Sequence, residues 1–65
     1  MSRTVEIYVD LVTADTDSAF QFRIDGIDYW VPKSLIDLDE SEATEKGMSG
    51  FVYIQEWKAI ELELV

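Results

Sequence analysis

The sequence predicts a small α+β domain, with an antiparallel sheet of three to four strands, a central Asp-Gly hairpin and a short C-terminal helix packed on one face. Three observations support this prediction. Apolar and polar residues alternate near the N-terminus, two further alternating runs meet at an Asp-Gly pair, and residues 56–65 are rich in helix-forming side chains. With 65 residues, the chain is expected to form a single domain over residues 1–65.

The first alternating stretch, residues 5–12, predicts a half-buried strand. Its apolar side chains would share the inner face: Val5, Ile7, Val9 and Leu11. Glu6, Tyr8 and Asp10 would then lie on the outer face, because successive side chains on a strand point to opposite sides. The polar residues that follow, 14–18, predict a turn or loop.

The central hairpin is predicted over residues 19–31, with Asp25-Gly26 as a two-residue turn. This turn sets a register in which three apolar pairs share one face: Ile24 with Ile27, Phe22 with Tyr29, and Phe20 with Val31. On the opposite face Arg23 meets Asp28, a cross-strand pair worth about 0.2–1 kcal/mol. Gln21 meets Trp30, so the Trp30 side chain is expected to point outward. Pro32 ends the strand because it lacks an N–H group.

After Pro32 the chain becomes turn-rich and acidic. Ser34 is placed to cap a short turn, and residues 42–46 are compatible with a short helix that Gly47 would stop. Residues 51–55 predict another strand because β-branched and aromatic side chains dominate them. Residues 56–65 fit a strand or a helix. Helix is favoured, with Trp57, Ile60 and Leu64 as its apolar stripe and Trp57 as its buried anchor.

The composition removes the commonest catalytic groups. The chain has no Cys and no His, which excludes disulfides and thiolate metal sites and leaves no histidine base for a serine nucleophile. Ser34 follows Lys33, but adjacent residues on an extended chain point apart, so these two are expected to be a cap and a surface cation. The sequence therefore predicts a non-enzymatic protein without a cofactor.

The spacing of the acidic residues does not fit a calcium-binding loop of the EF-hand type. Asp15 with Asp17, and Asp37 with Asp39, have the alternate spacing that opens an EF-hand loop. Neither pair is followed by the glycine that such a loop needs at its sixth position, where Phe20 and Glu42 stand. No resident metal ion is expected.

The net charge of −9 favours a cationic partner. It argues against direct contact with DNA, RNA or an anionic membrane, which are all negatively charged. A basic nucleic-acid-binding protein would be attracted, and rows of carboxylates could imitate the phosphates of DNA. The candidate acids are Asp37, Asp39, Glu40, Glu42 and Glu45, followed by Asp10, Asp15 and Asp17. The alternative is that these acids only keep a small sheet in solution and block edge pairing.

Trp30 supports a second reading, because outward aromatic side chains are enriched at protein interfaces. The chain would then be an accessory or structural module that binds protein through apolar surface. Self-association belongs to this reading, since a homodimer would help to stabilise so short a chain. The alternative is that the C-terminal helix or another strand covers Trp30.

Residues 25–34, read as Asp-Gly-Ile-Asp-Tyr-Trp-Val-Pro-Lys-Ser, and later Glu56-Trp57 resemble a group of short proteins encoded by phages and prophages. Those proteins similarly show an Asp-Gly hairpin, a Trp-x-Pro-Lys-Ser segment and a Glu-Trp pair that opens a terminal helix. The resemblance implies a phage origin and no catalytic residues. By analogy with acidic anti-CRISPR and anti-restriction proteins, it implies a bacterial defence complex as target. The acidic residues 39–45 and the Glu-rich tail depart from the group.

The location expected from the sequence is the cytoplasm, here of a bacterial host. The first residues lack the apolar core of a signal peptide, and no apolar run is long enough to span a bilayer.

Overall fold

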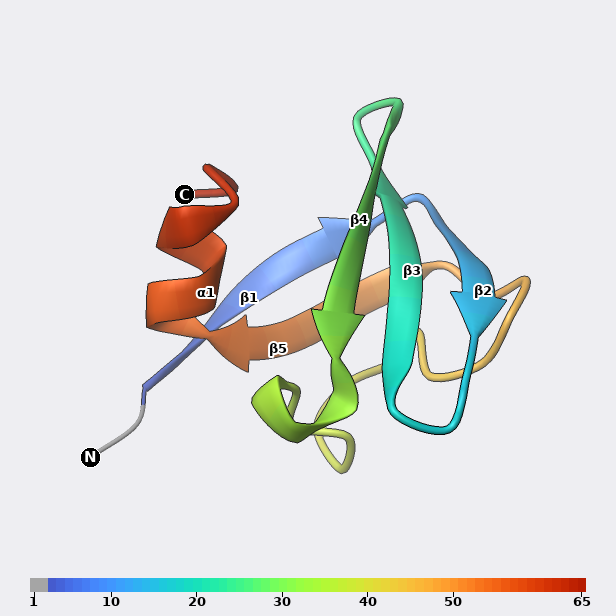
Figure 1. The fold of residues 1–65 in the computed structure, drawn as a ribbon, viewed down its shortest axis with the longest axis horizontal. Coiled ribbons are helices and arrows are strands. Elements are labelled where there is room, and N and C mark those ends of the chain that lie inside the picture. The colour runs from blue at the N-terminus through green and yellow to red at the C-terminus, as the bar shows by residue number, and fades with distance from the viewer. Residues whose placement is uncertain (1–2) are drawn as a thin grey trace.

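Two antiparallel sheets form the framework of the fold, which a computed structural model describes for residues 3–65 (Figure 1). In chain order the elements of these residues are β1 (Thr4–Val9), β2 (Leu11–Asp15), β3 (Ala19–Ile24), β4 (Ile27–Pro32), the 3-10 helix η1 (Lys33–Leu35), β5 (Gly50–Gln55) and α1 (Glu56–Glu61). β1 pairs with β5, and β2, β3 and β4 form the second sheet. The predicted α+β class is confirmed, with the strands divided between two sheets.

The hydrophobic core lies between the two sheets, whose strands cross steeply in Figure 1. Every strand contributes at least one buried apolar side chain: Ile7 and Val9, Val12, Phe20 and Phe22, Val31, and Val52 and Ile54. The rings of Phe20 and Phe22 stack with their centroids 5.5 Å apart. The alternate side chains of each strand therefore point away from the core, and the two sheets present separate outer faces.

The chain passes from one sheet to the other at Asp10. β1 ends at Val9 and β2 begins at Leu11, so the single strand expected over residues 5–12 does not form. The predicted alternation fails at this point, because Val12 is buried whereas Leu11 is only half-buried. The Asp10 N–H donates to the Arg23 carbonyl at 2.9 Å, which turns the chain towards β3. A further irregularity between Val12 and Ala14 bends β2.

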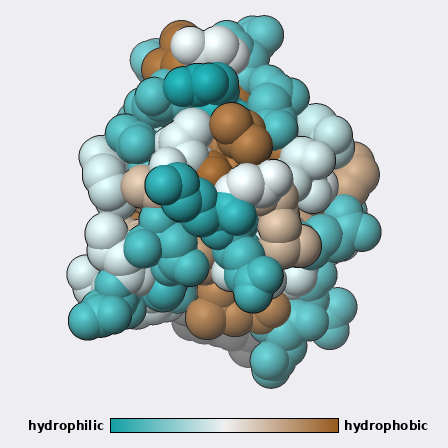
Figure 2. All heavy atoms as spheres, turned by 90° about the vertical axis from the view of Figure 1, so that its right-hand side faces the viewer, coloured by the Kyte–Doolittle hydropathy of each residue, from teal (hydrophilic) through white to brown (hydrophobic). Residues whose placement is uncertain are grey.

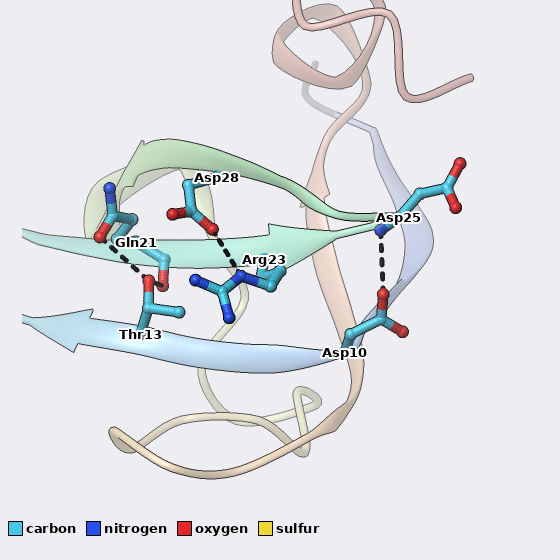
Figure 3. Close-up of polar contacts among 6 residues, drawn as sticks. All are labelled: Asp10, Thr13, Gln21, Arg23, Asp25 and Asp28. Atoms are coloured by element: carbon cyan, nitrogen blue, oxygen red, sulfur yellow. Dashed lines mark hydrogen bonds and ion pairs between the residues drawn. The ribbon is translucent and has the colours of Figure 1, made fainter.

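The central hairpin has the predicted register. Ile24 pairs with Ile27, Phe22 with Tyr29, Arg23 with Asp28 and Gln21 with Trp30. Asp25 and Gly26 have φ values of 54° and 82°, as a tight two-residue turn of the I′ type requires. Ile27 is nevertheless 57% exposed, because the turn end of the hairpin extends beyond the core. Figure 3 shows how that end is held: the Asp25 N–H donates to Asp10 Oδ2 at 2.9 Å.

The connection from β4 to β5 follows the outer edge of β5. The Asp37 N–H donates to the Tyr53 carbonyl at 2.9 Å, and the Glu42 N–H donates to the Phe51 carbonyl at 2.8 Å. The connection also buries Ala43 completely. Because the backbone of this connection is hydrogen-bonded to β5, residues 42–46 do not form the short helix that their sequence allows.

The predicted Ser34 cap does not form either. Ser34 lies inside η1, whose N-cap is Pro32 and makes no side-chain hydrogen bond. Pro32 ends β4 as expected, and its fixed φ of −59° leads directly into the helical turn. The helical turn thus lies earlier than the one expected after Ser34, and Ile36, which the expected turn included, is extended.

The tail begins as the favoured helix, α1, but the prediction of its buried side is wrong. Trp57 is 55% exposed, and Ile60 is also exposed. The fully buried residue is Ala59, whose small side chain allows the helix to approach the β1–β5 sheet closely. The chain then turns back at Glu63, where φ is 60°. This turn brings Leu62 and Leu64 against the core, so that of the predicted stripe only Leu64 packs there.

None of the helices in residues 3–65 has the length and apolar character needed to cross a lipid bilayer.

Candidate functional site

The outer face of the β1–β5 sheet carries aromatic and acidic side chains. Across the two strands, Glu6 lies opposite Tyr53 and Tyr8 lies opposite Phe51. Along each strand these residues alternate with buried residues, which face the core. Glu42, from the connection before β5, lies beside them, because its Oε1 atom accepts from the Phe51 N–H at 2.9 Å. The aromatic–acidic surface is defined here as Glu6, Tyr8, Glu40, Glu42, Phe51 and Tyr53.

The aromatic part of this surface is open to solvent. Tyr8 is 49% exposed and Phe51 is 40% exposed. Their ring centroids lie 5.2 Å apart with the planes at 76°, an edge-to-face arrangement that aromatic pairs favour. The two rings therefore hold each other in place while leaving a large part of their area free for contact.

The acidic part is organised around the Tyr53 hydroxyl. Tyr53 Oη donates a hydrogen bond to Glu6 Oε2 at 2.7 Å, and this bond is the main reason why the pKa of Tyr53 is raised above 10.0. Desolvation and the negative charges of Glu6, Glu40 and Glu42 raise the pKa of Tyr53 further. The structure thus brings carboxylates from β1 and from the connection into one neighbourhood.

Internal hydrogen bonds fix the part of the connection that carries these acids. The Glu40 N–H donates to Asp37 Oδ1 at 3.3 Å. Ser41 Oγ donates to the Asp37 carbonyl at 2.6 Å and accepts from the Tyr53 N–H at 3.0 Å. Asp37 and Glu42 therefore hold the connection to β5, and Asp39 and Glu40 lie between them; all four residues are exposed.

The other predicted acids lie elsewhere and do not join this surface. Asp10 supports the hairpin turn, and Asp15 forms an ion pair with Lys33 in which Oδ1 and Nζ are 2.7 Å apart. Asp17 is exposed in the turn between β2 and β3, and Glu45 is exposed in the turn before Gly47. Figure 2 looks onto the right-hand side of Figure 1, where β2 lies, and shows mainly hydrophilic residues with small, separate apolar areas.

Trp30 lies on the outer face of the other sheet, as predicted, and is 51% exposed. Its neighbours on that face form polar pairs that Figure 3 shows: Thr13 Oγ1 donates to Gln21 Oε1 at 3.0 Å, and Arg23 Nε lies 3.0 Å from Asp28 Oδ1. Neither α1 nor another strand covers Trp30. Trp30 and the aromatic–acidic surface are thus on opposite sides of the core.

Neither a small-ligand pocket nor a metal-holding group is found among residues 3–65. The described residues enclose no pocket for a small ligand. Although three carboxylates influence Tyr53, no group of three or more Asp or Glu side chains in residues 3–65 is arranged to hold a metal ion. The aromatic–acidic surface is thus an exposed group of rings and carboxylates.

Of this surface, the sequence predicted only Glu40 and Glu42 as site residues, and Phe51 was among those it missed. Its alternation with the buried Val52 marks it as outward-facing once residues 51–55 are read as a strand. Its proximity to Tyr8 depends on the pairing of β1 with β5, which no local pattern reveals. Comparison with protein-family models, curated proteins and solved structures found no match.

Proposed function

We propose that the protein binds a basic nucleic-acid-binding protein through the aromatic–acidic surface and thereby excludes nucleic acid from that partner. The observation that carries this proposal is the gathering of Glu6, Glu40 and Glu42 around Tyr53, beside the exposed rings of Tyr8 and Phe51. Together with the net charge of −9, this arrangement offers a cationic groove both charge and contact area.

The physical basis is electrostatic attraction combined with ring contacts. Negative charge on a small protein steers it towards a Lys- and Arg-lined surface and raises the association rate. An arginine that reaches the surface can stack on Tyr8 or Phe51 while its guanidinium pairs with Glu6 or Glu42. The protein would occupy the groove without catalysing a reaction, as a mimic of the DNA that the groove holds.

The resemblance to short phage proteins suggests a more specific target. A bacterial defence complex, such as a CRISPR surveillance complex or a restriction enzyme, has a basic groove for DNA, and its inhibition would benefit a phage. Such a target would be met in the cytoplasm of a bacterial host. This step rests on the resemblance at residues 25–34 and on the analogy with acidic inhibitors.

The test compares two variants with the same change in net charge. Glu6→Lys with Glu40→Lys alters the aromatic–acidic surface, whereas Glu61→Lys with Glu63→Lys alters exposed residues of the tail. Partners captured from a bacterial lysate at low and high salt are identified, and each variant then competes with duplex DNA for the purified partner. The surface variant should lose roughly tenfold or more in affinity and show a weaker salt dependence, while the tail variant should change much less. Equal losses of affinity in both variants would mean that net charge alone matters, and would refute the aromatic–acidic surface as the binding site.

Trp30 favours a second candidate function, protein binding through apolar surface, because its indole is half exposed on the opposite side of the molecule. Binding of this kind should depend little on salt and should fall when Trp30 is replaced by Ala. A partner that is lost with Trp30→Ala but retained after the charge reversals would support this candidate over the first.

A further inference from the structure

The outer edge of β4 presents unpaired backbone groups. β4 is the last strand in the order β2-β3-β4. The Lys33 N–H donates to the Ser18 carbonyl at 2.8 Å, and the Arg23 carbonyl accepts from Asp10 on the other side of β3. Hydrogen-bonded and non-bonded pairs alternate in an antiparallel ladder, so Arg23 and its partner Asp28 turn their backbone groups away from each other. Trp30, two residues further on, has the same orientation as Asp28.

Asp28 and Trp30 therefore point their N–H and C=O groups away from β3, and no backbone group in residues 3–65 pairs with them. The outer edges of β5 and β2 are covered. The connection before β5 bonds to Phe51 and Tyr53, and the same connection bonds to β2, where the Gly47 N–H donates to the Val12 carbonyl at 2.8 Å. An open strand edge is a template for another strand.

The side chains of β4 place little net charge along this edge, so charge does not prevent another strand from pairing with it. Asp28 is paired with Arg23, and the other residues of the strand are uncharged. Ile27 and Trp30 are both more than half exposed. In a chain with a net charge of −9, β4 carries a single acidic residue whose charge Arg23 offsets, which favours a partner that is itself close to neutral at the contact.

We infer that β4 pairs in antiparallel fashion with β4 of a second copy of this chain, about a two-fold axis at Tyr29. In this register Asp28 of one copy faces Trp30 of the other. Every outward N–H and C=O of these two residues then gains a partner in the other copy, since both belong to a bonded pair. The two three-stranded sheets become one continuous sheet, with both Trp30 side chains on its outer face. This inference does not depend on the proposed function, which uses the opposite side of the molecule.

β1 offers the alternative edge, but its charges oppose the same pairing. The Glu56 N–H donates to the Arg3 carbonyl, so the alternation along β1 turns the backbone groups of Glu6 outward. A two-fold axis at Ile7 would set Glu6 of each copy opposite Tyr8 of the other and bring the Glu6 carboxylates of both copies into one short contact. The hydrogen bond that Glu6 receives from the neutral Tyr53 hydroxyl does not offset its charge, whereas Arg23 offsets the charge of Asp28 on β4.

The pairing is expected to be short and weak. Pro32 has no N–H group and ends the usable edge, so the contact is far smaller than a standard stable interface. Two copies that each carry −9 also repel each other. Salt screens this long-range repulsion and leaves the strand pairing in place, so the dimer should become more stable as ionic strength rises.

Sedimentation equilibrium over a range of protein and salt concentrations tests the inference. The wild-type chain should pass from monomer towards dimer at high protein concentration and high salt. Trp30→Lys should lower the association constant roughly tenfold or more, because it removes a large interface side chain and adds edge charge. Trp57→Lys is the matched control, since Trp57 is equally exposed but lies on α1, and it should associate like the wild type.

Amide hydrogen exchange locates the contact. The Asp28 and Trp30 amides should exchange rapidly in dilute protein and become protected as the dimer forms. A chain that stays monomeric under all these conditions would overturn the inference. So would a dimer that is indifferent to Trp30→Lys, or one that leaves these two amides unprotected.

Discussion

The side chain of Glu42 occupies the space that a Cβ atom on Gly50 would need. Such a Cβ atom would lie 2.9 Å from Glu42 Oε1 and 3.0 Å from Glu42 Cβ. Gly50 also has a φ of 138°, which side-chain-bearing residues rarely adopt. The glycine at the start of β5 therefore lets the acidic connection lie directly on the strand.

Gly50→Ala is expected to destabilise the protein by about 1–3 kcal/mol, because it adds backbone strain and a steric clash. Gly47→Ala is the matched control: Gly47 also has a positive φ, of 91°, but nothing lies within 4 Å of the added Cβ. Urea unfolding monitored by circular dichroism measures both. Equal losses of stability in the two variants would show that Glu42 does not approach Gly50.

Asp10→Ala should loosen the turn of the central hairpin. The Asp25 N–H loses its carboxylate acceptor, and we expect a destabilisation of about 0.5–1.5 kcal/mol. Asp17→Ala makes the same change in charge at an exposed position of the β2–β3 turn and should have little effect. The hairpin amides around Asp25 should also exchange faster in Asp10→Ala than in the wild type. If both variants unfold at the same urea concentration, the Asp10 contact contributes nothing.

The stability of the protein should fall at alkaline pH as Tyr53 ionises. The pKa of Tyr53 is raised in the folded state, so the folded chain holds this proton more tightly than the unfolded chain does. The resulting stability is fully present below pH 10.0, the ordinary pKa, and is lost as the pH rises through the higher, folded-state pKa.

Glu6→Gln should bring the pKa of Tyr53 closer to its ordinary value, because it removes the charge that the Tyr53 hydroxyl contacts. The measurement is the tyrosinate absorbance during alkaline titration, with Tyr53→Phe used to identify the signal of Tyr53. An unchanged Tyr53 titration in Glu6→Gln would contradict the hydrogen bond.

Trp57→Ala should alter stability little, by roughly 0.5 kcal/mol or less, because the side chain is mainly exposed. Phe22→Ala, in contrast, should cost about 3–5 kcal/mol, because Phe22 is fully buried in the core. The fluorescence of Trp57 should respond to a water-soluble quencher in the folded protein. A large loss of stability in Trp57→Ala would indicate that Trp57 is buried and anchors the helix, as the sequence predicted.

The central hairpin could be predicted in full register because its determinants are local. Asp25-Gly26 adopts the positive φ values of the turn, and the turn fixes which residues face each other. The fold class followed from the same alternation. The break at Asp10 could not be predicted, because the apolar alternation continues past it, and the bend depends on a hydrogen bond to Arg23 in another strand.

The candidate site was only partly visible in the sequence for the same reason. The acidic connection stood out by composition, and Tyr8 with Glu6 stood out as outward residues. That Glu6 lies against Tyr53, 47 residues away, depends on the pairing of β1 with β5. Trp57 was misjudged because apolar spacing identifies a helix face without saying which neighbour it meets. The return of the chain at Glu63 brings Leu62 and the predicted Leu64 to the core from beyond the end of α1.

The pairing of β1 with β5 has a consequence for the order of events during synthesis. The β3–β4 hairpin is local and can form while the chain is still growing, whereas β1 must wait until β5 has left the ribosome. Until then the apolar side of β1, with Ile7 and Val9, has no strand beside it and is open to chaperones or to other nascent chains. The acidic residues made before β5 add charge to this unfinished chain and so oppose its aggregation.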